Sequence, residues 1–218
     1  MEEKWLTELR NSYDKVANQY TARIYGELAH KPYDRALLDD FAERLRGRGP
    51  LCDLGCGPGH VARYLHERGA SVCGVDLSPA MVAQAREQNP GIMFTEGNML
   101  ALDVPDGAWA GVVAFYSIIH LPRSEVRRAL SEMYRALRPE GLCRVAFHLG
   151  KDHLHLEEWW GEQVSLDCTF FSAEEVEAHM LAVGFEIERR EEREPYPDIE
   201  YPSRRGYIRA RKPAVLTS

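Results

Sequence analysis

The stretch LCDLGCGPG, residues Leu51 to Gly59, runs from a short apolar segment into a turn with glycines at positions 55, 57 and 59. Such a turn is typical of the point where the first strand of a parallel α/β sheet gives way to a helix. Further β-prone runs lie at residues 71–75, 92–95, 111–116 and 142–148, and each is followed by a segment with helical signals. The alternation predicts an α/β fold built on a parallel sheet.

Capping residues mark the predicted helices. Ser78 before Pro79 predicts a helix that continues to Asn89, and Ser172 with Glu175 predicts another. A third helix, about 123–137, ends at a turn over residues 138–141. Amphipathic helices at about 4–20 and 32–47 precede the first strand, and we expect them to cover part of the structure. Residues 186–192 and 206–211 read as two strands that pair antiparallel at a sheet edge.

Composition narrows the class of protein. The 218 residues, 44% of them hydrophobic, are enough for one domain with its own core. Acidic residues outnumber basic ones by 34 to 27, so the chain should repel a nucleic-acid backbone. No signal peptide or membrane-spanning run is visible, and we expect a cytoplasmic protein. The five cysteines are odd in number and unevenly spaced, which favours reduced thiols in the core.

The glycine turn itself distinguishes between two kinds of cofactor. A dinucleotide fingerprint would have the spacing G-x-G-x-x-G, but here the third glycine is Gly59 and the next residue is His60. Pro58 removes a backbone N–H from the loop, and Asp53 would repel a pyrophosphate but attract a cation. The turn therefore favours a phosphate-free, positively charged cofactor, and S-adenosyl-L-methionine fits this description.

The ends of the following strands supply matching groups. Asp76 ends the second strand, where a carboxylate can accept both ribose hydroxyl protons. Asn98 follows the third strand and offers an amide to the adenine, with Met99 and Leu77 or Met81 as apolar neighbours. The fourth strand ends with Ala114, Tyr116, Ser117 and His120 beside the expected methionine portion.

Four motifs, DLGCGPG, GVDLSPAMVAQAR, EGNM and MYRALRPEG, occur in this order within residues 51–148, which resemble the class I S-adenosylmethionine-dependent methyltransferases of the small-molecule type. The resemblance implies a three-layer Rossmann-like sandwich with a seven-stranded, mostly parallel sheet and one antiparallel strand near its edge. Asn98 stands where the family commonly has Asp. The segment SYDKVANQYTARIYGE resembles the family's N-terminal region, which would bring Tyr13 and Tyr20 to the cofactor or substrate, although the two tyrosines would equally well pack the helix on the sheet.

The predicted cofactor-binding residues are Tyr13, Asp53, Gly55, Cys56, Gly57, Gly59, Asp76, Leu77, Met81, Asn98, Met99, Tyr116 and Ser117. The predicted catalytic residues are His120, His148 and Tyr20, because a protonated nucleophile would need a base and histidine suits neutral pH. Four histidines, His30, His60, His66 and His179, fall on or near predicted helices and are expected to be exposed to solvent. The irregular spacing of His148, His153 and His155 fits no standard zinc pattern, so no metal is expected.

We therefore expect a single methyltransferase domain with a helical lid at residues 1–50, a cofactor-binding core at 51–148 and a substrate-side region at 149–218. The expected reaction is direct transfer of a methyl group to oxygen or nitrogen of a small-molecule substrate. We expect neither nucleic acid nor membrane as a partner, and a monomer or homodimer. The alternatives are a non-catalytic protein that binds the same cofactor and a nucleotide-dependent oxidoreductase, against which the glycine spacing, Pro58 and Asp53 argue.

Overall fold

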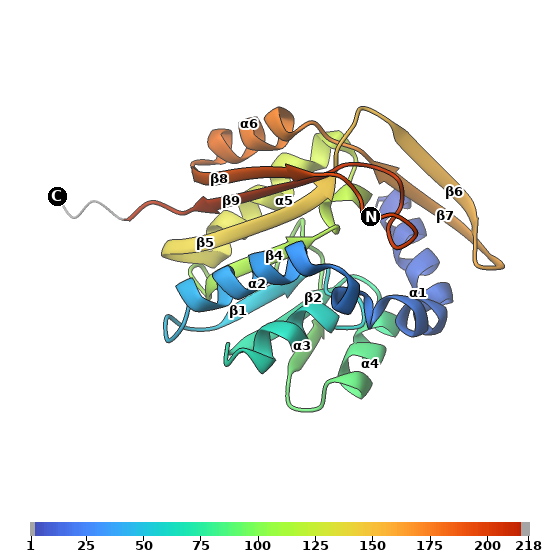
Figure 1. Ribbon diagram of the computed structural model, residues 1–218, viewed down its shortest axis with the longest axis horizontal. Coiled ribbons are helices and arrows are strands. Elements are labelled where there is room, and N and C mark those ends of the chain that lie inside the picture. The colour runs from blue at the N-terminus through green and yellow to red at the C-terminus, as the bar shows by residue number, and fades with distance from the viewer. Residues whose placement is uncertain (1–2, 215–218) are drawn as a thin grey trace.

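The computed structural model describes residues 3–214, in which β1 (Leu51–Leu54) lies near the middle of a seven-stranded sheet (Figure 1). The strand order is β3-β2-β1-β4-β5-β9-β8. The other strands are β2 (Val72–Asp76), β3 (Met93–Glu96), β4 (Trp109–Phe115), β5 (Leu137–His148), β8 (Glu186–Arg193) and β9 (Arg205–Arg211). The first five pair in parallel, and β9 runs antiparallel to both β5 and β8. The predicted mostly parallel sheet, with its antiparallel strand next to the edge, is confirmed.

Helices cover both faces of the sheet and complete the three layers. On one side α2 (Pro32–Arg44), α3 (His60–Glu67) and α4 (Pro79–Gln88) pack against β1, β3 and β4. On the other, α5 (Arg123–Ala136) and α6 (Ala173–Val183) share the largest group of buried apolar side chains. Both predicted caps are present, because the Oγ atoms of Ser78 and Ser172 accept hydrogen bonds from the third residue beyond each.

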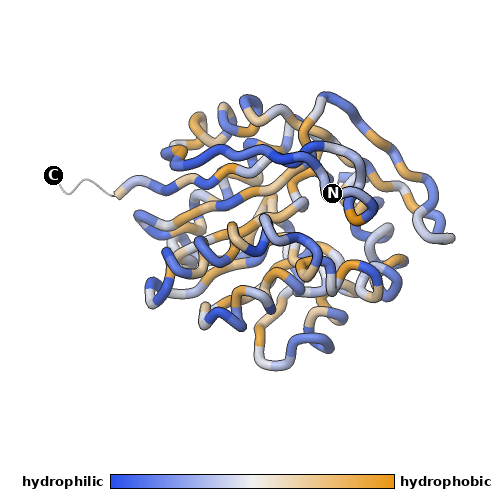
Figure 2. Tube along the Cα trace, viewed as in Figure 1, coloured by the Kyte–Doolittle hydropathy of each residue, from blue (hydrophilic) through white to orange (hydrophobic). Residues whose placement is uncertain are grey.

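The turn predicted at residues 138–141 takes a different form. Helix α5 ends at Ala136, and β5 starts directly at Leu137, so these residues lie inside the strand as an irregularity in its pairing with β4. Glu140 has a φ of 62°, a left-handed conformation that marks this break. At the far edge, β8 is hydrophilic along its length, which blunts pairing with another chain (Figure 2).

A second, smaller unit stands beside the carboxyl ends of the parallel strands (Figure 1). It consists of α1 (Lys4–Ile24) and a hairpin of β6 (His153–Trp159) and β7 (Glu162–Thr169). The two elements bury Val16, Val164 and Leu166 in a cluster of their own. The sequence did not predict this hairpin, which occupies the region assigned to the substrate side. Two short 3₁₀ helices, η1 (Glu27–His30) and η2 (Ile118–His120), lie near this unit.

Candidate active site

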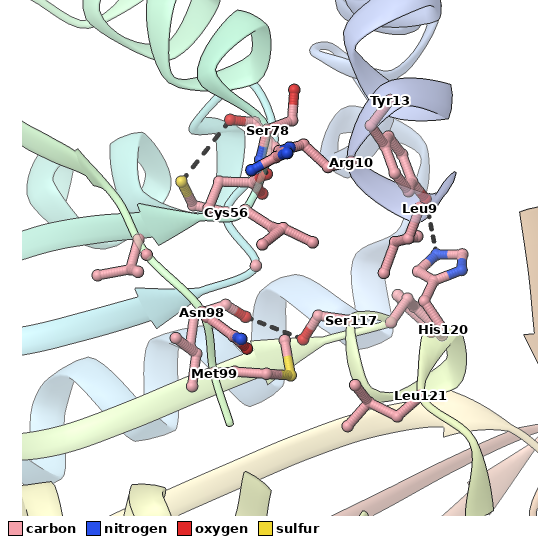
Figure 3. Close-up of a pocket in the computed structure, with 18 of the residues that line it drawn as sticks. Leu9, Arg10, Tyr13, Cys56, Ser78, Asn98, Met99, Ser117, His120 and Leu121 are labelled. Atoms are coloured by element: carbon pink, nitrogen blue, oxygen red, sulfur yellow. Dashed lines mark hydrogen bonds between the residues drawn. The ribbon is translucent and has the colours of Figure 1, made fainter. Parts of the chain in front are cut away.

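A cavity of about 810 Å³, including its open mouth, lies between the carboxyl ends of the parallel strands and α1 (Figure 3). Most of the predicted site residues line it: Tyr13, Tyr20, Gly55, Cys56, Gly57, Asp76, Leu77, Asn98, Met99, Tyr116, Ser117 and His120. Residues far apart in the chain therefore meet at the edge of the sheet where α/β folds bind their ligands.

The glycine turn forms one wall of the cavity, and its backbone conformation requires glycine. Gly55 has a φ of 74°, and a Cβ atom there would lie 2.3 Å from Cβ of Ser117. Gly57 has a φ of 51°, and its Cβ would lie 3.7 Å from the ring of Tyr20 on α1. The bare backbone of the turn is thus held between the end of β4 and the N-terminal helix, close enough to contact a ligand in the cavity.

Asp76 joins this turn to the end of β2. Its Oδ2 accepts a hydrogen bond from the Gly57 N–H at 2.7 Å, and its Oδ1 accepts one from Ser78 N–H at 2.9 Å. Loss of contact with water raises the pKa of Asp76 to about 6, against the opposing effect of these two amides. The carboxylate is fixed in place and keeps lone pairs free for hydroxyl donors in the cavity.

Three of the predicted cofactor residues lie behind the cavity wall. Asp53 is buried, and its Oδ2 accepts a hydrogen bond from Ala62 N–H at 3.0 Å in the first turn of α3. Burial raises the pKa of Asp53 to about 7. Gly59 precedes α3 with a φ of 82°, and a Cβ there would meet the ring of Phe94 at 2.7 Å. Met81 is fully buried in the core. Asp53 and Gly59 therefore lie where they can hold the shape of the turn, and Met81 packs in the core.

At the η2 end, Tyr13 and His120 form a hydrogen-bonded pair (Figure 3). The Tyr13 hydroxyl lies 2.6 Å from Nε2 of His120, and Nδ1 of the same ring lies 3.0 Å from the backbone carbonyl of Asp167 on β7. Because a carbonyl only accepts, Nδ1 carries the proton and Nε2 accepts from the tyrosine. Desolvation lowers the pKa of His120 to about 4 and raises that of Tyr13 well above its usual value. The pair is neutral at pH 7.

His148, the second predicted catalytic histidine, lies outside the cavity lining. Its ring stacks on Phe170, with the centroids 5.2 Å apart, and its Nδ1 lies 2.7 Å from Oγ of Ser203. Desolvation and the charge of Arg205 lower the pKa of His148 to about 3. Its ring centroid is 5.5 Å from that of Tyr116, which separates it from the cavity.

Several lining residues were missed by the sequence analysis. His60, expected to be exposed, lines the cavity with only 12% of its side chain accessible and Nε2 3.3 Å from Oε1 of Glu27. Leu6, Leu9 and Arg10 also line it, from α1. No local pattern distinguishes these residues, because their position follows from how α1 and η1 pack over the sheet. On the hairpin, His153 and His155 both contact the Asp167 carboxylate, at 3.0 and 2.7 Å.

Part of the chain is similar in sequence to known proteins. Residues 51–141 match the family model of a methyltransferase domain. A malonyl-[acyl-carrier protein] O-methyltransferase of Serratia marcescens is 33% identical over 142 residues, 62% of this chain and 54% of that protein. A demethylmenaquinone methyltransferase of Thermus thermophilus is 37% identical over 137 residues, 59% and 60% of the two chains. The chain spans about half the length of the first of these relatives.

Solved structures agree on the fold. The structure of a DhpI–SAH complex matches 98% of this chain and 99% of its own, with a TM-score of 0.71 at 19% identity. A methyltransferase of Haloferax volcanii, solved with the activator Trm112, matches 96% and 100%, with a TM-score of 0.70 at 18% identity. The sheet order and the glycine turn thus define a Rossmann-like methyltransferase fold. Residues 51–141 are thus similar to a methyltransferase domain, and the fold of the whole described chain is similar to that of S-adenosylmethionine-dependent methyltransferases.

No helix within residues 3–214 is both long and apolar enough to cross a membrane. All five cysteines are free thiols, and Cys52, Cys56 and Cys143 are buried, as the sequence predicted for core thiols.

Proposed function

We propose that the protein transfers a methyl group by direct displacement to a small molecule, and that the acceptor atom is an oxygen. The observation that carries the proposal is that one cavity holds both the Asp76 carboxylate and the neutral Tyr13–His120 pair. The Asp76 carboxylate can accept hydrogen bonds from the ribose hydroxyls of the cofactor. The Tyr13–His120 pair can take up the proton of an acceptor hydroxyl.

The residues present fit the cofactor. Asp76 has lone pairs for the ribose hydroxyls, and Gly55 and Gly57 line the cavity with backbone atoms alone. Oδ1 of Asn98 accepts from the Leu100 N–H at 2.9 Å, which orients the amide so that its NH₂ group can donate to the adenine. We propose that these residues hold the cofactor, with Met99 and Leu77 as apolar neighbours. When bound, S-adenosylmethionine supplies an electrophilic methyl group on a sulfonium.

The pair at the other end accounts for the proton. As the bond from the acceptor oxygen to the methyl carbon forms and the carbon–sulfur bond breaks, the hydroxyl group becomes strongly acidic. Its proton passes to the Tyr13 oxygen while the tyrosine proton moves to Nε2 of His120, which leaves an imidazolium and a neutral tyrosine. A pKa of about 4 makes His120 too weak a base to deprotonate a methylated amine, which favours oxygen over nitrogen as the acceptor atom.

The surroundings of this pair favour an apolar acceptor. Leu9 of α1 and Leu121 beside η2 lie near Tyr13 and His120 (Figure 3), and Leu6 of α1 also lines the cavity. Curated relatives are named as a malonyl-[acyl-carrier protein] O-methyltransferase and as a demethylmenaquinone methyltransferase. We propose an acceptor of this general kind, with α1 acting as the lid that excludes water from the reaction.

The test uses the full chain with methyl-labelled S-adenosylmethionine and a panel of phenols, enols, carboxylic acids and amines. We expect S-adenosylhomocysteine to bind, and label to pass to a hydroxylated acceptor. Asp76→Ala should remove binding, whereas His66→Ala, at an exposed position on α3, should change neither property. A protein that binds the cofactor but labels no member of the panel would be a non-catalytic binder, and transfer to amines alone would contradict the choice of oxygen.

A further inference from the structure

Tyr116 has a strained backbone conformation at the edge of the cavity. Its φ is 55°, in the left-handed region that residues other than glycine rarely adopt. Four non-glycine residues within 3–214 have such a φ, and Tyr116 is the one among them that lines the cavity. Strain of this kind persists only where the surrounding structure enforces it. The side-chain contacts of Tyr116 therefore have to stabilise a conformation that its backbone disfavours.

These contacts come from a buried network behind the cavity wall. The Tyr116 hydroxyl lies 3.2 Å from Oδ1 of Asp34 on α2 and 2.9 Å from the hydroxyl of Tyr207 on β9. The Tyr207 hydroxyl also lies 3.2 Å from Oδ1 of Asp34. Arg193, at the end of β8, donates to Oδ2 of Asp34 at 2.6 Å and to the Tyr207 oxygen at 2.9 Å. Asp34 is buried, so three separate elements fix the hydroxyl end of Tyr116 away from water.

Two buried cations hold the ring of the same tyrosine. Nζ of Lys31 lies 5.4 Å from the ring centroid of Tyr116, and the guanidinium carbon of Arg205 lies 5.6 Å from it. Both distances are within the range of cation–π contacts. The two cations in turn contact the Glu200 carboxylate, at 3.6 and 3.7 Å. The side chain of Tyr116 is thus fixed at its hydroxyl and at its ring, although the backbone stays left-handed.

The left-handed residue turns the chain from β4 into η2. Ser117, which follows it, lines the cavity and donates from Oγ to the Leu54 carbonyl at 2.9 Å, beside the glycine turn. The Ser117 carbonyl accepts a hydrogen bond from the His120 N–H at 3.3 Å. His120 in turn carries the Nε2 atom that lies 2.6 Å from the Tyr13 hydroxyl. A change of φ at Tyr116 would therefore move both the wall beside the glycine turn and the proposed proton acceptor.

We propose that Asp34 is a positioning residue for this site. Through the hydroxyl of Tyr116 it stabilises the left-handed turn from which Ser117 and η2 reach the cavity. Asp34 itself lies outside the cavity lining and acts only through the tyrosine. The inference rests on the proposed function, because it assumes that S-adenosylhomocysteine binds in this cavity.

The experiment measures the Kd of S-adenosylhomocysteine by titration calorimetry. Asp34→Asn keeps the size of the side chain, but its single amide oxygen cannot serve both Arg193 and the two tyrosines. If the turn then leaves its left-handed form in about nine molecules out of ten, the Kd rises about 10-fold, because only the competent fraction binds. Tyr116→Phe keeps the ring and removes only the hydroxyl, so the Kd should rise by about 3- to 10-fold, the effect of one lost hydrogen bond.

Tyr116→Gly distinguishes positioning from a general loss of stability. Glycine adopts a left-handed φ without strain, so the turn no longer depends on the network. The variant has an effect of its own on the Kd, because it removes a ring from the cavity wall. In the Tyr116→Gly background, however, Asp34→Asn should change the Kd by no more than about twofold. A double-mutant cycle of the four proteins measures this difference.

Tyr33→Phe is the matched control. It removes a tyrosine hydroxyl that donates to the Glu191 carboxylate at 3.1 Å, in a ring whose centroid is 5.6 Å from that of Tyr207. Tyr33 lies outside the cavity lining, so this variant should keep the Kd within about twofold of wild type. Thermal unfolding of each variant checks that the titrated protein is folded.

Two results would overturn the proposal. If Asp34→Asn and Tyr116→Phe both leave the Kd unchanged, the network does not hold the site. If Asp34→Asn raises the Kd equally with tyrosine and with glycine at position 116, it acts on the domain and not on the turn. Should Asp34→Asn not fold, Tyr116→Phe decides, because it leaves the ion pair of Asp34 with Arg193 in place. A wild-type protein that does not bind S-adenosylhomocysteine would instead refute the proposed function, and this inference with it.

Discussion

Replacement of Tyr13 by phenylalanine tests the proton path directly. The substitution keeps the ring, which packs edge-on against Tyr20 and Trp159, and removes only the hydroxyl that lies 2.6 Å from Nε2 of His120. Nδ1 of His120 remains bonded to the Asp167 carbonyl, so the imidazole keeps its place and its tautomer. The variant therefore separates loss of the relay from loss of the site.

The structure sets the size of two effects. Loss of one partly enclosed hydrogen bond, with Nε2 left unpaired, should reduce the free energy of unfolding by about 1 to 2 kcal/mol. For a chain of this length that corresponds to a fall in the unfolding midpoint of roughly 2 to 8 °C. If the proton passes through Tyr13, kcat should fall by about 100-fold or more, the usual contribution of a positioned proton acceptor. The Kd of S-adenosylhomocysteine should change by no more than about twofold.

Tyr64→Phe is the matched control, because it also removes one hydroxyl hydrogen bond, to Asp39 at 3.0 Å, but outside the cavity. It should show a similar loss of stability and unchanged kcat. Single-turnover rates with saturating acceptor, together with calorimetric Kd values, distinguish the cases. The relay is refuted if Tyr13→Phe keeps kcat within about twofold of wild type. A raised Kd with unchanged kcat would instead make Tyr13 a cofactor contact, as its sequence context first suggested.

Two further predictions concern the cofactor half of the site. Gly55→Ala should lower the free energy of unfolding in urea by about 2 to 5 kcal/mol, because Gly55 has a left-handed φ of 74° and an added Cβ would clash with Ser117. Gly91→Ala is the control: its φ is 99° but the space around it is open, so the loss should be about 1 to 2 kcal/mol. Equal losses for the two variants would contradict the steric argument. Binding of S-adenosylhomocysteine should weaken as the pH falls through about 6, because Asp76, whose pKa is raised to about 6, then takes up a proton and loses acceptor capacity. Calorimetry between about pH 5 and 8 measures this dependence, and Asp76→Asn should abolish it.

Much of the fold was predictable from local patterns. Most strand boundaries followed from apolar runs, although β5 begins at Leu137 and not at residue 142 as predicted. The helix starts after Ser78 and Ser172 followed from caps that the structure reproduces. The hairpin at 153–169 was not predictable in this way. Its first strand alternates between exposed and partly buried residues, and the apolar side chains Val164 and Leu166 of its second strand pack against α1, more than a hundred residues earlier. A two-stranded hairpin without such a partner is marginal, so sequence alone gave little reason to expect it.

Some residues of the candidate site could likewise be predicted from local sequence patterns, and others could not. Residues at the ends of β1, β2 and β3 meet because parallel strands share an edge, so Gly55, Asp76 and Asn98 could be placed from their position after each strand. The direction in which each side chain points was harder to predict. Asp53 belongs to the same turn, but its side chain points to the backbone of α3. A residue one position from the cavity on a strand faces the opposite side of the sheet, and only the path of the chain shows which side that is.

The acceptor half depends on contacts across long intervals of sequence. The tautomer of His120 is set by a carbonyl 47 residues later and by a tyrosine 107 residues earlier. One nitrogen of this ring is fixed by an acceptor on β7, which makes the other nitrogen an acceptor toward Tyr13. His60, at the opposite end of the cavity, contacts the buried Glu27 on η1, whereas leucines near His120 favour a neutral hydroxyl. The surroundings of each ring, more than its residue type, therefore determine which part of the reaction it serves.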